Sequence, residues 1–101
     1  MKLAYDSDLR DLKLEMRPVL IAADKVWKKH GRELVITCTG GGVHSPGSLH
    51  YYGYAIDLRT NYFGTEQVKE VARDLISELP DGFQVIVERT HIHVEYDAIL
   101  R

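Results

Sequence analysis

The sequence predicts an α+β fold, in which helices pack on one face of a small, mainly antiparallel sheet. Two stretches, residues 8–30 and 65–79, carry apolar residues at three- and four-residue steps, the spacing of amphipathic helices. Four shorter stretches are rich in apolar and β-branched residues, as in strands. The resulting order is helix, strand, strand, helix, strand, strand, which is typical of helices packed on a mainly antiparallel sheet.

The first helical segment is interrupted by Pro18. Proline lacks an N–H and clashes with the preceding turn of a helix, so we expect a short helix up to Met16 and a second helix from Pro18. Gly31 is placed to end the second helix. Trp27 is expected to anchor the core. The apolar positions that define the segment are Leu9, Leu12, Met16, Leu20, Ala23 and Trp27.

The first strand is expected from Glu33 to Thr39, because Leu-Val-Ile-Thr-Cys is a nearly continuous apolar run. It leads into three glycines and a Pro-Gly pair, which predict a loop over residues 40–47. The next strand is expected from Ala55 to Thr60. This loop and strand flank the residues to which the chemistry is assigned below.

The second helix is expected to be capped by Thr65 and to end near Leu79, before Pro80-Asp81-Gly82. Two strands follow, from Phe83 to Val87 and from His91 to Tyr96. The three residues between them favour an antiparallel hairpin. The apolar stripe of the helix comprises Val68, Val71, Ala72, Leu75, Ile76 and Leu79.

Size and composition indicate one soluble domain, residues 1–101, with 45% hydrophobic and 28% charged residues. A net charge of −2 gives no case for nucleic acid or an anionic membrane as partner. The single Cys38 forms no internal disulfide and is expected to be a small core residue. No stretch approaches the ~20 apolar residues of a membrane span. The first residues lack the apolar region of a signal peptide, so we expect synthesis in the cytoplasm.

Two polar motifs carry the chemistry of this sequence. Residues 48–59 contain His50 and Asp57, and residues 88–95 contain His91 and His93, with Glu88 as a spare carboxylate. Zinc binds histidine nitrogen and carboxylate oxygen, and a catalytic site uses three protein ligands with water in the fourth place. Because side chains alternate along a strand, His91, His93 and Glu95 are expected to share one face. Such a row alone is more often a solvated surface.

The string Ser48-x-His50-x-x-Gly53-x-Ala55-x-Asp57, followed by His91-x-His93-Val-Glu95, resembles the zinc D-alanyl-D-alanine peptidases of the M15 type. These peptidases share a fold with the Hedgehog signalling domain. The resemblance runs from about Leu34 to Glu95 and implies a Hedgehog/DD-peptidase-like fold. It also implies a bound zinc ion and, as substrates, the stem peptides of bacterial peptidoglycan.

The resemblance implies that His50, Asp57 and one histidine of the second motif bind zinc. We expect His93 to be that ligand, because His-Val-Glu matches the family's ligand followed by an apolar residue and an acid. In the alternative register, Glu88-x-x-His91 is the matching unit. With His93 as ligand, His91 lies near enough to donate to the developing oxyanion or to hold the bound water.

Glu88 is the predicted base, which takes the proton of a zinc-activated water and passes it to the leaving amine. Its alternative role is that of a surface residue paired with Arg89 or Arg59. Ser48 is expected to hydrogen-bond a ligand or the loop. His44 is a candidate substrate contact, and an exposed loop histidine is the equal alternative.

One departure from the family concerns substrate recognition. Many members carry an arginine in the loop after the first strand, and residues 37–44 contain none. Arg59, Arg89 or His44 then recognises the substrate carboxylate, or the substrate has no free carboxylate there, which favours an endopeptidase. The predicted activity is therefore D-Ala-D-Ala carboxypeptidase or L-Ala-D-Glu-type endopeptidase, acting on the cell wall, with a phage lysis enzyme as one setting. The alternatives are a non-catalytic zinc-binding module of the same fold and a metal-free relic of it.

Overall fold

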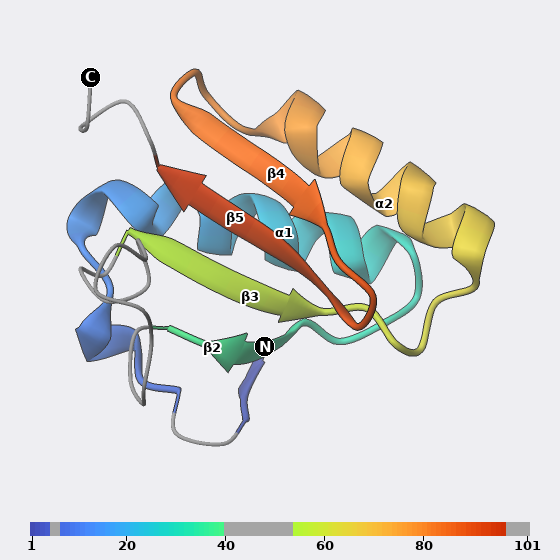
Figure 1. The fold of residues 1–101 in the computed structure, drawn as a ribbon, viewed down its shortest axis with the longest axis horizontal. Helices are drawn as coiled ribbons and strands as arrows, with labels where there is room; N and C mark the ends of the chain where they lie inside the picture. The colour runs from blue at the N-terminus through green and yellow to red at the C-terminus, as the bar shows by residue number, and fades with distance from the viewer. Residues whose placement is uncertain (5–6, 40–53, 97–101) are drawn as a thin grey trace.

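The computed structural model of the chain describes residues 1–4, 7–39 and 54–96 (Figure 1). Within these ranges it has five strands and two α-helices, and two 3-10 turns precede the first helix. The strands are β1 (Lys2–Leu3), β2 (Val35–Cys38), β3 (Ala55–Arg59), β4 (Phe83–Val87) and β5 (His91–Tyr96), and the helices are α1 (Arg17–Lys29) and α2 (Thr65–Glu78).

The strands form a single sheet in the order β1-β2-β3-β5-β4. The pairs β2–β3, β3–β5 and β4–β5 are antiparallel, and β4 and β5 form the expected hairpin. The α+β class is confirmed, but the sheet is mixed, because β1 pairs with β2 in parallel. The sequence gives no sign of β1, since two residues are too few to show an alternating pattern.

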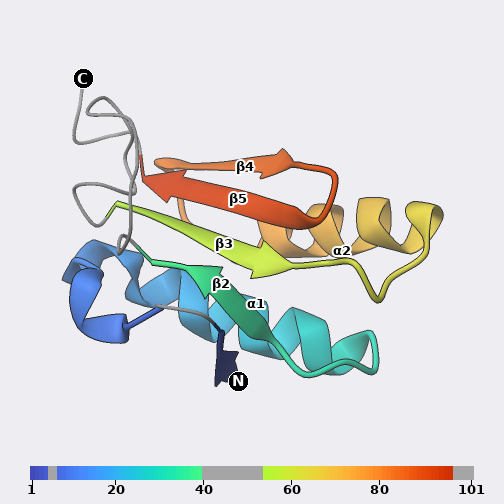
Figure 2. The ribbon, with the colours of Figure 1, turned by 60° about the horizontal axis from the view of Figure 1, so that its bottom comes forward.

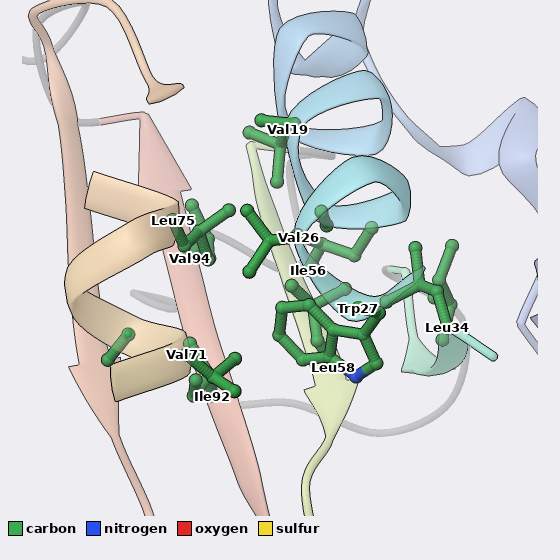
Figure 3. Close-up of a cluster of buried hydrophobic side chains, with 14 of the residues drawn as sticks. Val19, Val26, Trp27, Leu34, Ile56, Leu58, Val71, Leu75, Ile92 and Val94 are labelled. Carbon is green, nitrogen blue, oxygen red and sulfur yellow. The ribbon is translucent and has the colours of Figure 1, made fainter. Parts of the chain in front are cut away.

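Both helices cover the same face of the sheet (Figure 2). The side chains between the helices and the sheet form the core, and every strand from β2 to β5 contributes to it. Figure 3 shows the centre of this cluster, in which helix α1 packs over β3 and helix α2 over β5. The labelled members are Val19, Val26, Trp27, Leu34, Ile56, Leu58, Val71, Leu75, Ile92 and Val94.

Helix α1 begins one residue before Pro18, where a missing N–H costs no intrahelical bond. The second helix begins within one residue of Pro18, as predicted, but it follows directly on the preceding segment, and two 3-10 turns, Leu9–Asp11 and Leu14–Met16, stand in place of a short α-helix. Gly31 follows the helix with φ of +78°, a conformation that residues with a side chain rarely adopt. The predicted end of this helix is confirmed.

Helix α2 differs from its prediction at both ends and on one face. Gly64 occupies the N-cap position without a side-chain hydrogen bond, so the prediction that Thr65 caps the helix is wrong. The helix ends at Glu78, one residue before the predicted end. Ile76, which was assigned to the apolar stripe, is 57% exposed. It lies outside the buried face because it is about 100° around the helix from the buried Leu75.

Trp27 is fully buried, as predicted, and it fastens α1 to the end of β3. Its indole N–H lies 3.1 Å from both the carbonyl oxygen of Arg59 and the hydroxyl oxygen of Tyr62. The Tyr62 hydroxyl in turn donates to the carbonyl of Glu33 at 2.8 Å. Burial raises the pKa of Tyr62, which keeps this hydroxyl a donor.

Cys38 is half-buried at the end of β2, so the prediction that it is a core residue is wrong. The pairing of β2 with β3 shifts register between Ile36 and Cys38. A shift of this kind changes which face a side chain takes. Within the described ranges, no helix has the length and apolar character needed to cross a membrane.

Candidate functional site

The sheet face turned away from the helices carries a polar row across β3 and β5. On these strands Ile56, Leu58, Ile92 and Val94 are fully buried in the core. Since side chains alternate along a strand, the residues between them point to the opposite face. The register places Asp57 opposite His93, Arg59 opposite His91, and Ala55 opposite Glu95. The two motifs singled out in the sequence therefore meet on one face.

Asp57, His93 and Glu95 form a continuous hydrogen-bonded chain. The Nδ1 atom of His93 lies 3.0 Å from Oδ1 of Asp57, and its Nε2 atom lies 3.0 Å from Oε1 of Glu95. Asp57 and His93 are 36 residues apart in the sequence. The three side chains are only 16–20% exposed. An imidazole donates through both nitrogens only when it carries a positive charge, so a neutral ring donates to only one of these two carboxylates.

His91 stands beside this chain at its Asp57 end. Its Nε2 atom lies 3.6 Å from Oδ1 of Asp57, the same oxygen that contacts His93. Its Nδ1 atom lies 3.2 Å from the hydroxyl of Thr90. One carboxylate oxygen of Asp57 is therefore flanked by two imidazoles.

These distances fit a metal centre in part. Two atoms that bind one zinc ion tetrahedrally at 2.0–2.2 Å lie about 3.3–3.6 Å apart. The contacts of Asp57 with His93 and His91, at 3.0 and 3.6 Å, bracket this spacing. Even so, the described residues do not by themselves include a group of three or more His, Cys, Asp or Glu side chains that could hold a metal ion. The predicted site also needs His50, which lies outside the described residues, as do Ser48 and His44.

A hollow of about 370 Å³ opens beside Asp57 and His91. Arg59 is the one lysine or arginine among the side chains described as lining it. It stands opposite His91 in the register. The lining consists of Thr37, Cys38, Asp57, Arg59, Asn61, Thr90 and His91.

Glu88, the predicted base, is exposed just after β4. Its backbone N–H donates to the carbonyl of His91 at 2.9 Å. Glu88 lines a second hollow, of about 390 Å³, together with Val68 and Arg89. In the described part of the chain, no hydrogen bond or ion pair joins its carboxylate to Asp57, His91 or His93.

Glu95 is the second carboxylate in contact with His93, and the sequence analysis assigns it no role. The signal was present, because Glu95 lies two residues after His93 on the same strand and period two places both on one face. Glu88 is predicted as the base from its position in the motif. Whether its carboxylate can reach Asp57, His91 or His93 depends on how β4, β5 and β3 pair, which the motif does not show.

The chain was compared with known proteins. It matches no protein-family model, and no curated protein shows significant similarity to it.

Proposed function

We propose that this protein is a zinc-dependent peptidase that hydrolyses peptide bonds in the stem peptides of bacterial peptidoglycan. The observation that carries the proposal is the contact between Asp57 and His93 across β3 and β5. It joins the two motifs on which the resemblance to the M15-type peptidases depends. Neighbouring polar residues on a strand are common, but a half-buried carboxylate held between imidazoles from a distant motif is typical of a metal or catalytic site.

In this proposal Asp57 and His93 bind zinc together with His50. The Nδ1 atom of His93 faces Asp57 and is the atom that would bind zinc, while its Nε2 atom stays bonded to Glu95. A carboxylate on the far nitrogen fixes the tautomer and orientation of a ligand histidine and raises its basicity. Glu95 is then a positioning residue. Zinc bound there supplies a Lewis acid for the scissile carbonyl and acidifies a water molecule.

The proton transfers are assigned to Glu88 and His91. Glu88 accepts the proton of the attacking water and delivers it to the leaving amine. His91, beside Asp57, donates to the oxygen on which negative charge develops. Glu95 is the competing candidate for the base, because it is the carboxylate already in contact with His93.

Substrate binding is assigned to the hollow beside Asp57, and Ser48 and His44 are proposed as further contacts. Arg59 lines this hollow, and a guanidinium binds a carboxylate through two parallel hydrogen bonds. This arrangement suits a D-Ala-D-Ala carboxypeptidase, in which the substrate ends in a free carboxylate next to the cleaved bond. An L-Ala-D-Glu-type endopeptidase remains the alternative, in which Arg59 contacts a side-chain carboxylate.

Metal content of the purified protein tests the proposal. Zinc near one equivalent per chain is expected for the wild type, and its loss is expected in His50→Ala, Asp57→Ala and His93→Ala. His91→Ala is expected to retain zinc, as is the control His30→Ala, which removes an imidazole bonded to Asp74 instead. Retention in His93→Ala with loss in His91→Ala would establish the other register. A wild type that holds no zinc after reloading would overturn the proposal.

The second candidate function is a non-catalytic zinc-binding module, which the exposed position of Glu88 in a separate hollow favours. Hydrolysis of purified stem peptides by the wild type, Glu88→Gln and Glu95→Gln separates the two functions. A peptidase with Glu88 as base retains zinc in Glu88→Gln and loses turnover by a factor of roughly 10²–10⁴. A zinc-loaded wild type that cleaves none of these peptides would support the binding module.

A further inference from the structure

The outer edge of strand β4 is a second feature of the molecule that predicts an interaction. β4 ends the sheet, and its one strand neighbour among the described residues is β5. Its sequence, Phe-Gln-Val-Ile-Val, has no charge and no proline, and its register with β5 runs without a bulge from Phe83 to Val87. Edge strands usually carry a charge, a proline or a bulge, or are very short, because these features prevent pairing with other chains. At the opposite edge, β1 has only two residues.

The hydrogen-bonding groups on this edge can be assigned from the hairpin. The N–H of Glu88 donates to the carbonyl of His91, so these two residues form a hydrogen-bonded pair. In an antiparallel ladder such pairs alternate, so Gln84 and Ile86 also bond to β5. The N–H and C=O groups of Phe83, Val85 and Val87 therefore point outward, away from the sheet.

We propose that the partner of this edge is a second copy of the chain, which pairs β4 antiparallel to β4 about a two-fold axis at Val85. In this register Val85 pairs with Val85 of the second copy, and Phe83 pairs with Val87. These are the residues whose backbone groups point outward. The pairing joins two five-stranded sheets into one continuous sheet.

Charge complementarity selects this occupant. Counting outward from Val85, the antiparallel register places the exposed Arg89 of each copy opposite the exposed Asp81 of the other. Glu88 meets Gly82, which has no side chain to oppose it. Two symmetric pairs of opposite charge thus flank an uncharged strand. A peptide of arbitrary sequence would supply the backbone bonds but not these charge pairs.

The apolar side chains next to this edge support the same partner. Val87 and Ile76 are 50% and 57% exposed. Asp74 and Glu78 of α2 bond to α1, and Leu75 is buried against the sheet. By helical spacing, Ile76 then projects on the side of α2 away from α1, beside β4. Pairing of β4 brings the two α2 helices together on one face, where these side chains lose exposure to water.

The two-fold axis would be perpendicular to the sheet, so the two polar rows lie on the same open face. Five strand spacings separate β3 of one copy from β3 of the other, which places the two Asp57 residues roughly 24 Å apart. A polymeric ligand can contact both sites at the same time, and it then binds the dimer more tightly than it binds a single site, because the second contact is intramolecular.

Sedimentation of the whole chain across the micromolar concentration range tests the pairing. The wild-type mass is expected to rise with concentration from 11.5 kDa towards twice this value. Arg89→Glu and Asp81→Arg each place like charges at both ends of the interface, so each is expected to weaken association by about tenfold. The double variant restores opposite charges and is expected to recover the wild-type association.

Lys13→Glu and Glu15→Arg are the matched controls, because they make the same charge changes at exposed positions near the N-terminus. They are expected to associate like the wild type. A wild type that remains at 11.5 kDa at every concentration overturns the proposal. So does a double variant that associates no better than either single variant, since the register depends on the pairing of Arg89 with Asp81. None of these outcomes depends on zinc or on peptidase activity.

Discussion

At the scale of single residues, the informative feature is that His93 lies between two carboxylates. Asp57 and Glu95 contact its two ring nitrogens, and all three side chains are largely shielded from water. Removing one partner of such a group leaves a buried polar atom without its bond, which costs more than the bond contributes. Because each carboxylate contacts a different ring nitrogen, replacing one of them removes the hydrogen bond of that nitrogen alone.

Glu95→Gln is expected to lower zinc affinity by roughly 10–100-fold while leaving the fold intact, because Glu95 orients the ligand His93 without binding the metal. Competition with a coloured chelator measures the affinity. Glu70→Gln, an exposed change on α2, is the control and is expected to bind zinc like the wild type. Equal affinity in Glu95→Gln and wild type would show that the contact with His93 does not orient a ligand.

At the scale of elements, one contact fixes the position of α1 relative to the strand that carries Asp57. The indole N–H of Trp27 bonds to the carbonyl at the end of β3 and to Tyr62. The same residue fills the centre of the core (Figure 3). The side chain of Trp27 therefore supplies both core packing and hydrogen bonds, and together these align α1 with β3.

Trp27→Phe is expected to lower the free energy of unfolding by about 1–3 kcal/mol from the unsatisfied hydrogen bond alone, and further through the smaller ring. Urea unfolding followed by circular dichroism measures it, since the variant has lost the tryptophan fluorophore. Ile21→Ala, which truncates an exposed side chain of the same helix, serves as the control and is expected to stay within about 0.5 kcal/mol of wild type. A cost below that limit for Trp27→Phe would show that the indole bonds contribute nothing to stability.

The two helices are also joined by a charged contact with a defined pH dependence. Asp74 of α2 lies 2.8 Å from Nε2 of His30 and 3.2 Å from Nζ of Lys29. The hydrogen bond from His30, followed by that from Lys29, lowers the pKa of Asp74 below its ordinary 3.8. A lowered pKa in the folded state means that stability is gained above the unfolded pKa and lost as the pH falls through the folded pKa.

Asp74→Asn is therefore expected to destabilise the protein at pH 6, and the difference from wild type is expected to shrink below pH 3.8. Urea unfolding at pH 6 and at pH 3 gives the two differences. Glu70→Gln, at an exposed position on α2, is the control and should show no such trend. A difference that is the same at both pH values would rule out the ionised contact as its source.

At the scale of the whole molecule, the proposed metal centre joins two strands whose site residues are 36 positions apart in the sequence. Asp57 comes from β3 and His93 from β5, and each strand also contributes buried residues to the core. A ligand that binds only the folded chain raises the free energy of unfolding. Zinc is therefore expected to stabilise the entire domain and not the site alone.

Zinc at about 100 times its dissociation constant is expected to stabilise the folded chain by about 2.7 kcal/mol. For a domain of this size that corresponds to a rise in Tm of roughly 10–20 °C. Thermal unfolding with added zinc or with a chelator measures it. Asp57→Asn is expected to abolish the shift, and the exposed Glu70→Gln is expected to retain it. An equal shift in Asp57→Asn would place the bound zinc elsewhere on the chain.

The sequence by itself determined which residues of β5 face the core and which face outward. The alternation in His91–Tyr96 predicts that Ile92 and Val94 are buried and that His91, His93 and Glu95 share the other face. The two helices and the hairpin follow equally from local spacing and turn residues. These features depend on neighbours only a few residues away, so they can be read along the chain.

Tertiary structure alone decided the register and the order of the strands. It placed β3 beside β5, which brings Asp57 to His93. It also added β1 in parallel, exposed Ile76 and left β4 at the edge of the sheet. The physical reason is that pairing between distant strands depends on packing across the whole sheet. Shifting one strand by a single residue would turn each of its side chains to the opposite face of the sheet, while its sequence pattern would stay the same.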